Sequence, residues 1–448
     1  MRSKLPKVLH PVCGVPMLTR VLNTVSNMKP ASIGVVVGHE GNRVIAEVKK
    51  DRRIEWIWQK EPLGSGHAVR SASSWMKKSL KEAQHLLILC GDTPLISRKT
   101  LESFLNFHLQ NRKCATILSS VATDPFGYGR IVRNGGKRVS KIVEEKDASP
   151  EERKINEINS GIYCFETKKL LEALPNLKNN NAKREYYITD AIEYLSQKNY
   201  LVETFPDALN EESFGVSETL GINTRADLAS AEQFLQNKIL KSWMKKGVTI
   251  LNPGFTHIEE SVQIEPETVL LPGTMLRGKT KIGSYCQIGP NSWIEDSEIG
   301  NHAVVRASFV YGSKIGERAQ VGPYSHLRAG TRIAEGARVG NFTEIKNSKV
   351  GRETKISHLA YVGDSVLGEE INVGAGTITC NFDGKNKHKT IIGSQSFVGS
   401  NVNLIAPVKI GARTMIAAGS TITKDVPPDS LAIERSALVI KKGWAKKR

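Results

Sequence analysis

The second half of the chain carries an aliphatic residue at every sixth position, with mostly polar residues and glycines between. The first run starts at Ile258 and reaches Ile294 in uninterrupted steps of six. Its continuation, after several slips, is Ile315, Val321, Leu327, Ile333, Val339, Ile345, Val350, Ile356, Val362, Leu367, Val373, Ile392, Val398, Leu404, Ile410, Ile416 and Ile422. A period of six suits short strands that turn at regular corners with one side chain inward. The pattern therefore predicts a parallel β-helix of hexapeptide repeats.

One segment interrupts this period. Between Val373 and Ile392 the inward positions would fall on Thr379 and Lys385, which cannot line an apolar interior. We therefore expect residues 376–387 to leave the coil as a loop. Loops that project from a rigid scaffold often carry functional residues.

The first half of the chain has a different texture, in which short apolar runs alternate with amphipathic segments. Residues 33–38 and 86–92 are expected to form buried parallel strands, and residues 66–81 a helix between them. A further helix is expected at residues 225–247. This order predicts an α/β sheet that binds its ligand at the carboxyl ends of the strands.

Composition is that of a globular protein, with 40% hydrophobic and 24% charged residues in 448. We expect a cytoplasmic protein without membrane partners, because the N-terminus lacks an apolar signal region and no apolar stretch approaches the roughly 18 residues of a membrane span. The six cysteines show no paired spacing, which fits a reducing compartment. The net charge of +18 raises the possibility of a nucleic-acid scaffold, but only 6% of residues are aromatic, so we expect no nucleic-acid partner.

Specific motifs occur along both halves. In the first half they are Leu-Pro-Lys-Val-Leu-His (5–10), Gln59 with Leu-Gly-Ser-Gly-His-Ala (63–68), Gly-Asp-x-Pro-Leu (91–95), Gly-Tyr-Gly-Arg-Ile (127–131), Ile-Val-Glu (142–144), Glu-Ile-Asn-Ser-Gly (157–161) and Glu-Tyr-Tyr-Ile-Thr-Asp (185–190). In the second half they are Leu-Arg-Ala-Gly (327–330), Gly-Asn-Phe-x-Glu-x-Lys (340–346), His-Leu-x-Tyr-x-Gly-Asp (358–364) and the segment 372–381. With these motifs the chain resembles the bifunctional bacterial N-acetylglucosamine-1-phosphate uridylyltransferase and glucosamine-1-phosphate N-acetyltransferase family.

The resemblance implies a fold of two parts. A Rossmann-like α/β nucleotidyltransferase domain would cover residues 1–224, followed by a linker helix at 225–247. A left-handed parallel β-helix acetyltransferase domain would cover residues 248–425, and a basic tail residues 426–448. The family's product, UDP-N-acetylglucosamine, is a precursor of peptidoglycan and lipopolysaccharide, and its hexapeptide acyltransferases are homotrimers with sites shared between subunits.

The resemblance also implies the residues of uridylyl transfer, in which N-acetylglucosamine 1-phosphate attacks UTP. This reaction gathers negative charge, so it needs a cation near the phosphates and a metal held by oxygen ligands. Lys7 and Mg²⁺ fill these roles, with Asp92 and Asn223 matching the metal ligands. The uridine-binding positions are matched by Gln59, Gly64 and Ser65, and the sugar-binding positions by Gly129, Glu144 and Asn159.

For acetyl transfer from acetyl-CoA to glucosamine 1-phosphate, the amine must be neutral when it attacks the thioester, and histidine is a natural general base. His358 matches the family's base. The sugar-phosphate positions are matched by Arg328, Lys346, Tyr361 and Asn372, and the acetyl-CoA positions by Ala375, Asn381, Phe382, Ser400, Ala418 and Arg435. Phe382 stands where the family often has Tyr, and Cys90 also stands where Tyr is common.

The sequence departs from the family pattern at its first residue. Family members begin with an apolar strand and a glycine-rich loop, whereas Met1 here aligns with the end of that signature. Either the start has been assigned too late, or the uridylyltransferase domain is inactive and the chain is an acetyltransferase only. A third interpretation is a nucleotidyltransferase whose β-helix serves only assembly.

Overall fold

The computed structural model describes the whole chain except residues 49–52, 80–82, 111–112, 137, 208–216 and 448. Its internal contacts divide the chain into two compact units, Met1–Leu235 and Gln236–Arg448. The division falls within helix α8 (Arg225–Lys245). Among the described helices, none is both long and apolar enough to cross a membrane.

The larger sheet of the first unit has six strands. Their bounds are β5 (His85–Ile88), β6 (Ala115–Val121), β7 (Arg130–Arg133), β8 (Val139–Val143), β9 (Glu157–Glu166) and β10 (Val202–Pro206). The order is β10-β6-β9-β7-β8, with β5 also paired to β9. Strand β10 is parallel to β6, and the other pairs are antiparallel. The expectation of a parallel strand at residues 86–92 is therefore wrong in its pairing, because the long strand β9 runs against β5.

A second, separate sheet pairs β3 (Ile33–Val37) with β4 (Ile54–Trp58) in parallel, which confirms a parallel strand at residues 33–38. Among the described strands, β3 pairs only with β4 and β5 only with β9. Both β3 and β5 line a cavity of about 1100 Å³ whose wall is largely apolar, including Val35, Leu87 and Trp75. The two sheets are thus separated by unfilled apolar space.

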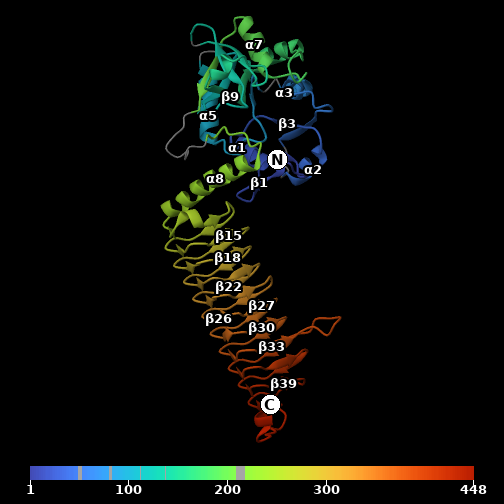
Figure 1. The fold of residues 1–448 in the computed structure, drawn as a ribbon, viewed down its shortest axis with the longest axis vertical. Coiled ribbons are helices and arrows are strands. Elements are labelled where there is room, and N and C mark those ends of the chain that lie inside the picture. The colour runs from blue at the N-terminus through green and yellow to red at the C-terminus, as the bar shows by residue number, and fades with distance from the viewer. Residues whose placement is uncertain (49–52, 80–82, 111–112, 137, 208–216, 448) are drawn as a thin grey trace. The chain divides into compact units, whose positions relative to one another are not determined.

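Helices pack around these sheets in the first unit (Figure 1). They are α1 (Met17–Asn27), α2 (Gly41–Glu47), α3 (Ser65–Ser71), α4 (Ser73–Ser79), α5 (Arg98–Leu109), α6 (Thr167–Ala173) and α7 (Thr189–Gln197), with 3-10 turns η1 (Lys7–Leu9), η3 (Glu152–Lys154) and η4 (Leu174–Asn176) and a short hairpin of β1 (Pro11–Val12) and β2 (Val15–Pro16). The expected single helix at residues 66–81 is two helices that meet at Ala72. Ala72 packs in the apolar core between them.

The second unit is a parallel β-helix with three sheets, in which each strand pairs in register with the strand one coil away. The first sheet contains β11 (Thr249–Ile250), β14 (Val269–Leu270), β17 (Gln287–Ile288), β20 (Val304–Val305), β23 (Gln320–Val321), β26 (Arg338–Asn341), β29 (Lys355–His358), β32 (Asn372–Val373), β35 (Phe397–Val398), β38 (Met415–Ile416) and β40 (Leu431–Ala432). The second contains β12 (His257–Ile258), β15 (Met275–Arg277), β18 (Trp293–Glu295), β21 (Phe309–Tyr311), β24 (His326–Leu327), β27 (Glu344–Lys346), β30 (Tyr361–Gly363), β33 (Ile378–Cys380), β36 (Asn403–Ile405) and β39 (Thr421–Ile422). The third contains β13 (Gln263–Ile264), β16 (Lys281–Ile282), β19 (Glu298–Ile299), β22 (Lys314–Ile315), β25 (Arg332–Ile333), β28 (Lys349–Val350), β31 (Ser365–Leu367), β34 (Thr390–Ile392) and β37 (Val408–Ile410). This is the left-handed β-helix expected of hexapeptide repeats.

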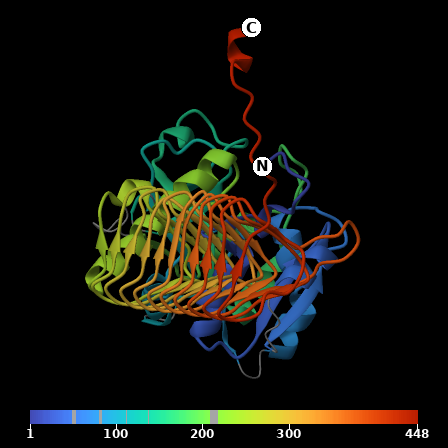
Figure 2. The same cartoon turned by 90° about the horizontal axis from the view of Figure 1, so that it is seen from below.

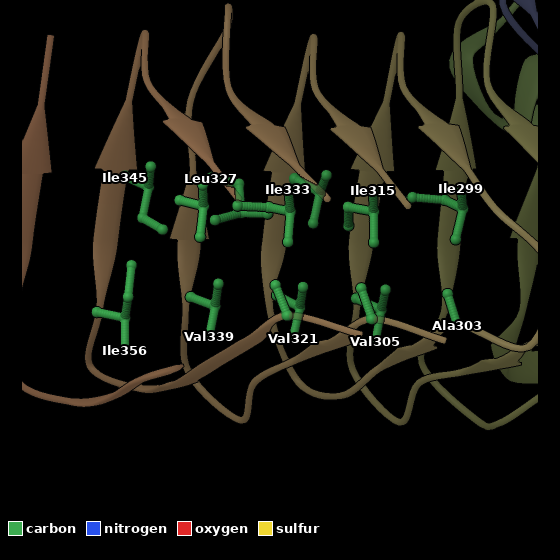
Figure 3. Packing of buried hydrophobic residues seen from close by; sticks show 14 of the residues in the cluster. Ile299, Ala303, Val305, Ile315, Val321, Leu327, Ile333, Val339, Ile345 and Ile356 are labelled. Atoms are coloured by element: carbon green, nitrogen blue, oxygen red, sulfur yellow. The ribbon is translucent and has the colours of Figure 1, made fainter. Parts of the chain in front are cut away.

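The aliphatic residues of the six-residue period fill the interior of this β-helix. Every residue of the predicted series is buried, from Ile258 at 0% exposure to Ile422 at 6%. Figure 3 shows how they stack in columns from coil to coil, with Val321 between Val305 and Val339. The hexapeptide prediction is confirmed at the level of single side chains.

The loop prediction is only partly right, because the coil continues to Cys380. Thr379 does occupy an inward position and is 1% exposed. Its hydroxyl oxygen accepts a hydrogen bond of 2.8 Å from the backbone N–H of Gly363, so the buried polar group is satisfied. The projecting loop therefore runs over residues 381–389, including Lys385, and stands out from the coil in Figures 1 and 2.

The last described residues continue beyond the coil. After β40 the described residues form no further strand, and Leu438, Val439 and Ile440 are exposed. A 3-10 turn, η7 (Trp444–Lys447), ends the described tail, which runs away from the coils in Figure 2. A further 3-10 turn, η6 (Pro253–Phe255), lies in the first coil.

Candidate active sites

Three polar residues of the first unit meet although they are far apart in sequence. Lys7 lies in η1, Asp92 follows β5, and Asn223 precedes α8. The Lys7 ammonium forms an ion pair with a carboxylate oxygen of Asp92 and donates to Asn223 Oδ1 at 2.6 Å. The Asn223 amide nitrogen faces the carbonyl of Gly221 at 3.3 Å, which directs its oxygen to the ammonium. Two oxygen ligands thus converge on one cation.

This donor set fits the Mg²⁺ implied by the resemblance. Within the described part of the chain there is no cluster of three or more His, Cys, Asp or Glu side chains arranged to hold a metal. Mg²⁺ typically binds through one or two protein oxygens, with waters and substrate phosphates as its other ligands. A carboxylate and an amide oxygen that already share a cation meet that requirement.

Asp227 holds this cluster in place, and the sequence analysis missed it. Its carboxylate accepts the backbone N–H groups of Asn223 and Thr224, each at 2.8 Å, while Thr224 Oγ1 accepts the Asp227 N–H at 3.0 Å. This reciprocal pair is a capping box at the start of α8. The spacing Thr-x-x-Asp before a helix was the signal that could have revealed it.

The three uridine-binding candidates lie around the start of α3. Gln59 follows β4, and its amide nitrogen lies 3.1 Å from the carbonyl oxygen of Gly64 and 3.1 Å from His67 Nδ1. Gly64 has φ of 102°, and a Cβ there would lie 2.6 Å from the Tyr186 carbonyl oxygen, so only glycine fits. Ser65 Oγ accepts the Ile188 N–H at 3.1 Å. These residues form one tight corner.

The sugar-binding candidates lie on β9 and beside it. The Asn159 N–H donates to the Gly129 carbonyl at 2.9 Å, and the Asn159 side-chain amide donates to the Tyr163 hydroxyl at 2.7 Å. Burial raises the pKa of Glu144, opposed by Lys183 and by a 3.4 Å hydrogen bond from the Thr189 hydroxyl. The three candidates therefore stand in a half-buried, polar setting suited to sugar hydroxyls.

Tyr187 is a further candidate at this site that sequence reasoning did not single out. Its ring is 6% exposed, and its buried hydroxyl has no hydrogen-bond partner in the described structure. Together with Glu144 and Lys183 it lines a cavity of about 420 Å³. A buried hydroxyl that faces a cavity is available to a ligand.

In the second unit, His358 is oriented by a neighbour in the preceding coil. It lies at the end of β29, directly opposite Asn341 in β26. His358 Nδ1 lies 2.5 Å from Asn341 Oδ1. Since a carbonyl oxygen can only accept, Nδ1 carries the proton and Nε2 is left as the basic nitrogen. Asn341 lay in a quoted motif, but its role became visible only in the structure.

A cationic cluster follows along the second sheet. The β24–β27 and β27–β30 registers place Arg328, Lys346 and Gly363 at one end of successive coils. Arg328 pairs with Glu344 at 3.0 Å. The neighbouring Lys387, from the projecting loop, lowers the pKa of Lys346. Like charges gathered in this way form a binding place for a phosphate dianion.

Tyr361 and Asn381 meet over Gly363. A Cβ on Gly363 would lie 2.6 Å from the Tyr361 hydroxyl and 2.8 Å from the Asn381 amide nitrogen, so glycine permits their approach. Asn381 donates to Asp364 at 2.6 Å, and so does Asn347. Burial acts to raise the pKa of Asp364, but these two hydrogen bonds together with the charges of Lys387 and Lys346 lower it. The carboxylate thus holds the amide of Asn381 in place.

Asn372 lies in the coil after His358 but not directly opposite it. The register of β29 and β32 places Asn372 opposite Lys355, three residues before His358. At about 3.3 Å per residue this separation is about 10 Å along the strand. Asn372 and His358 of one chain are therefore not strand neighbours.

The candidates for acetyl-CoA line one corner of successive coils. The Asn401 N–H donates to the Ala375 carbonyl at 2.7 Å, and the Gly419 N–H, next to Ala418, donates to the Ser400 carbonyl at 2.8 Å. Arg435 lies beside Gly419, and Phe382 is 59% exposed on the projecting loop. The corner offers a narrow column of small residues next to one arginine.

Comparison with known proteins agrees with both units. A nucleotidyl transferase family model matches residues 2–238, and a bacterial transferase hexapeptide model matches residues 312–347 and 389–424. Fold and sites therefore define an enzyme of the transferase class that joins a nucleotidyltransferase to a hexapeptide acyltransferase.

Curated relatives extend this over the whole chain. The bifunctional protein GlmU of Halalkalibacterium halodurans is 44% identical over 448 residues, which is all of this chain and 96% of that protein. The GlmU proteins of Listeria monocytogenes serotype 4a and of a Geobacillus species are 46% and 45% identical, covering 100% and 99% of this chain and 95% and 94% of theirs. The chain belongs to the family of bifunctional GlmU proteins. Because the matches span both units, the interpretations as an acetyltransferase only or as a scaffold are not favoured.

Proposed function

We propose that this chain makes UDP-N-acetylglucosamine in two steps. The β-helix transfers the acetyl group of acetyl-CoA to glucosamine 1-phosphate, and the first unit transfers uridylyl from UTP to the N-acetylglucosamine 1-phosphate formed. The observation that carries this proposal is full-length identity of 44–46% to bifunctional relatives, with an oriented histidine in one unit and paired oxygen ligands in the other. UTP and acetyl-CoA are cytoplasmic metabolites, so we place the enzyme in the cytoplasm.

For uridylyl transfer, a phosphate oxygen of the sugar attacks the α-phosphorus of UTP and diphosphate leaves. Asp92 and Asn223 would hold Mg²⁺, which supplies neutralising positive charge to the triphosphate. Lys7 adds a second cation where negative charge develops. Gln59, Gly64 and Ser65 bind the uridine, while Gly129, Glu144 and Asn159 orient the sugar.

For acetyl transfer, the sugar amine attacks the thioester carbonyl carbon, the C–S bond breaks and coenzyme A leaves as thiolate. His358 Nε2 removes the amine proton, because Nδ1 is committed to Asn341. Arg328 and Lys346 bind the sugar phosphate, and Tyr361 contacts the sugar. Asn381 and Phe382 flank the acetyl group, while Ala375, Ser400, Ala418 and Arg435 bind the rest of acetyl-CoA.

We further propose that the enzyme works as a homotrimer in which a neighbouring copy completes each acetyltransferase site. The distance along the strand between Asn372 and His358 supports this, as does the exposed Phe382 on a loop that leaves the coil. The test mixes two inactive variants, His358→Ala and Asn372→Ala, by co-expression. Recovery of acetyltransferase activity in the mixed oligomers is expected, and its absence, with soluble mixed oligomers present, would refute shared sites.

The two activities can be separated to test the assignment of residues. We expect Asp92→Ala to lose uridylyl transfer and retain acetyl transfer, and His358→Ala to do the reverse. Each variant is assayed for coenzyme A release and for diphosphate release on the same preparation. A wild-type chain that fails in either half reaction would contradict the proposed function.

A further inference from the structure

The amide of Gln59 has a defined orientation in this structure. Its nitrogen lies 3.1 Å from the carbonyl oxygen of Gly64, which can only accept a hydrogen bond. An amide turned the other way would set two oxygens against each other. The nitrogen therefore faces Gly64, and this hydrogen bond uses one of its two hydrogens.

The position of Gly64 is itself rigid. The N–H of Gly66 donates to the Tyr186 carbonyl at 2.7 Å, and the Tyr186 N–H donates to the Leu63 carbonyl at 2.8 Å. The segment 63–66 is thus attached to a second chain segment on both sides of Gly64. The carbonyl that receives the Gln59 amide has little freedom to move.

His67 takes the second hydrogen of the same amide. Its Nδ1 lies 3.1 Å from Gln59 Nε2, one turn into α3. Since Gln59 Nε2 donates here, Nδ1 must be the acceptor nitrogen, with the ring proton on Nε2. Both amide hydrogens of Gln59 are then used inside the protein, and its Oε1 remains as a pure acceptor.

A pure acceptor distinguishes the two pyrimidines. Uracil carries a hydrogen-bond donor at N3, whereas N3 of cytosine is an acceptor. An oxygen that faces N3 therefore binds uracil and repels cytosine, which would have to shift along its edge to offer its amino group instead. Unpaired polar groups in such a site are costly, so the discrimination is large.

We infer that His67 is a positioning residue for nucleotide choice: it holds Gln59 so that its Oε1 accepts the N3–H of uracil and excludes cytidine triphosphate. The inference rests on the proposed uridine site at Gln59. It adds His67 to that site and specifies which way the Gln59 amide is oriented. His67 itself does not contact the nucleotide.

The test compares kcat/KM for UTP with that for CTP. His67→Leu removes the acceptor and frees one amide hydrogen, so Gln59 can offer a donor to cytosine. We expect the UTP to CTP ratio to fall about tenfold or more, the effect of losing one hydrogen bond of about 1.4 kcal/mol. His67→Asn, whose carbonyl oxygen can still accept, is expected to keep most of the ratio.

The matched control is Ser71→Ala on the same helix. Ser71 Oγ donates to the His67 backbone carbonyl at 2.9 Å and does not reach Gln59 by any described bond. Its ratio should equal that of the wild type. Thermal inactivation of uridylyl transfer with UTP reports whether the first unit of each variant is folded, and His67→Ala replaces His67→Leu if the latter does not fold.

The outcomes separate this inference from the proposed function. A wild type that forms no UDP-sugar from UTP would overturn the proposed function. A wild type that prefers UTP, with an unchanged ratio in His67→Leu or His67→Ala, would overturn the inference alone. An equal loss of activity with both nucleotides means a general structural role for His67 and also overturns it.

Discussion

The two units of this chain differ in how completely their apolar cores are filled. In the β-helix each inward side chain lies between similar side chains of the coils before and after it, and the core is one continuous cluster. In the first unit the core is divided among several clusters, and β3 and β5 face a cavity of about 1100 Å³. Unfilled apolar volume forfeits dispersion contacts. The comparison shows that in a repeat structure the packing of each inward side chain depends only on the neighbouring coils. In an α/β sheet, by contrast, the packing of every strand depends on pairing with strands distant in sequence.

The largest expected effect separates the two units by their chemistry. His358→Ala should lower acetyl transfer by about 10²- to 10⁴-fold, because it removes the general base, and leave uridylyl transfer unchanged. Asn341→Ala removes the hydrogen bond that orients the His358 imidazole but leaves the imidazole itself in place. This variant should therefore lose less acetyl transfer than His358→Ala. Steady-state rates of both half reactions check this. Equal losses in both reactions would show that the units are not chemically separate.

A substitution at the proposed metal site of the first unit is expected to have nearly as large an effect on uridylyl transfer. Asp92→Asn should weaken Mg²⁺ binding, since it removes the negative charge among the proposed ligands. Binding of Mn²⁺, followed by electron paramagnetic resonance, should weaken at least about tenfold, with a matching rise in the Mg²⁺ needed for uridylyl transfer. Asp124→Asn, on another exposed segment of the same unit, is the control. Unchanged Mn²⁺ binding would remove Asp92 from the metal site.

Matched truncations test the packing difference itself. Leu276 is fully buried in an early coil of the β-helix, and its replacement by Ala should cost about 2–5 kcal/mol of stability. Leu87 borders the large cavity, so Leu87→Ala should cost only about 1 kcal/mol, because part of its surroundings is already empty. Thermal inactivation of acetyl and uridylyl transfer reports each unit separately. A larger loss from Leu87→Ala would contradict the account of the cavity.

A further expected effect is a dependence of the stability of the first unit on pH. His108 is fully buried, with Nε2 at 3.0 Å from His85 Nδ1 and Nδ1 at 2.8 Å from Thr116 Oγ1. Burial, followed by the charges of His85 and Lys113, lowers the pKa of His108 from its ordinary value of 6.5 to about 4. The unfolded chain therefore binds more protons between pH 6.5 and 4, and stability falls as the pH falls through this window.

The contribution of His108 is measured as a difference between proteins. Burial raises the pKa of Asp190 in the same unit to about 6, which gives the opposite slope, so the wild type alone is not decisive. His108→Gln should reduce the acid loss of stability by at most about 3 kcal/mol relative to the wild type. Denaturant unfolding at pH 7 and pH 4.5 measures this, and parallel curves for both proteins would exclude His108 as the source.

Sequence reasoning reached different depths in the two units for a physical reason. The inward residues of the β-helix were predicted individually, because each is set by a period of six that is visible within a few residues. The exception is Thr379, which was predicted to leave the coil but points inward. Its hydroxyl can be buried because it accepts a hydrogen bond from Gly363 in another coil. Composition alone could not show that partner.

In the first unit the sequence indicated candidate site residues but not how they meet. Lys7, Asp92 and Asn223 were recognised from motifs, yet their convergence comes from three distant segments. The break of the helix at Ala72, which lies in the apolar core, was likewise not visible in the sequence.

By itself, the sequence determined the repeat, the inward side chains, the two-part order and the residue types of both sites, because these are local patterns or motifs. Only the tertiary structure decided that β5 runs against β9, that Asn341 selects the basic nitrogen of His358, and that His67 orients Gln59. Each of these depends on hydrogen bonds between residues that are distant in sequence or outside any repeating pattern, so the local sequence does not specify the partner.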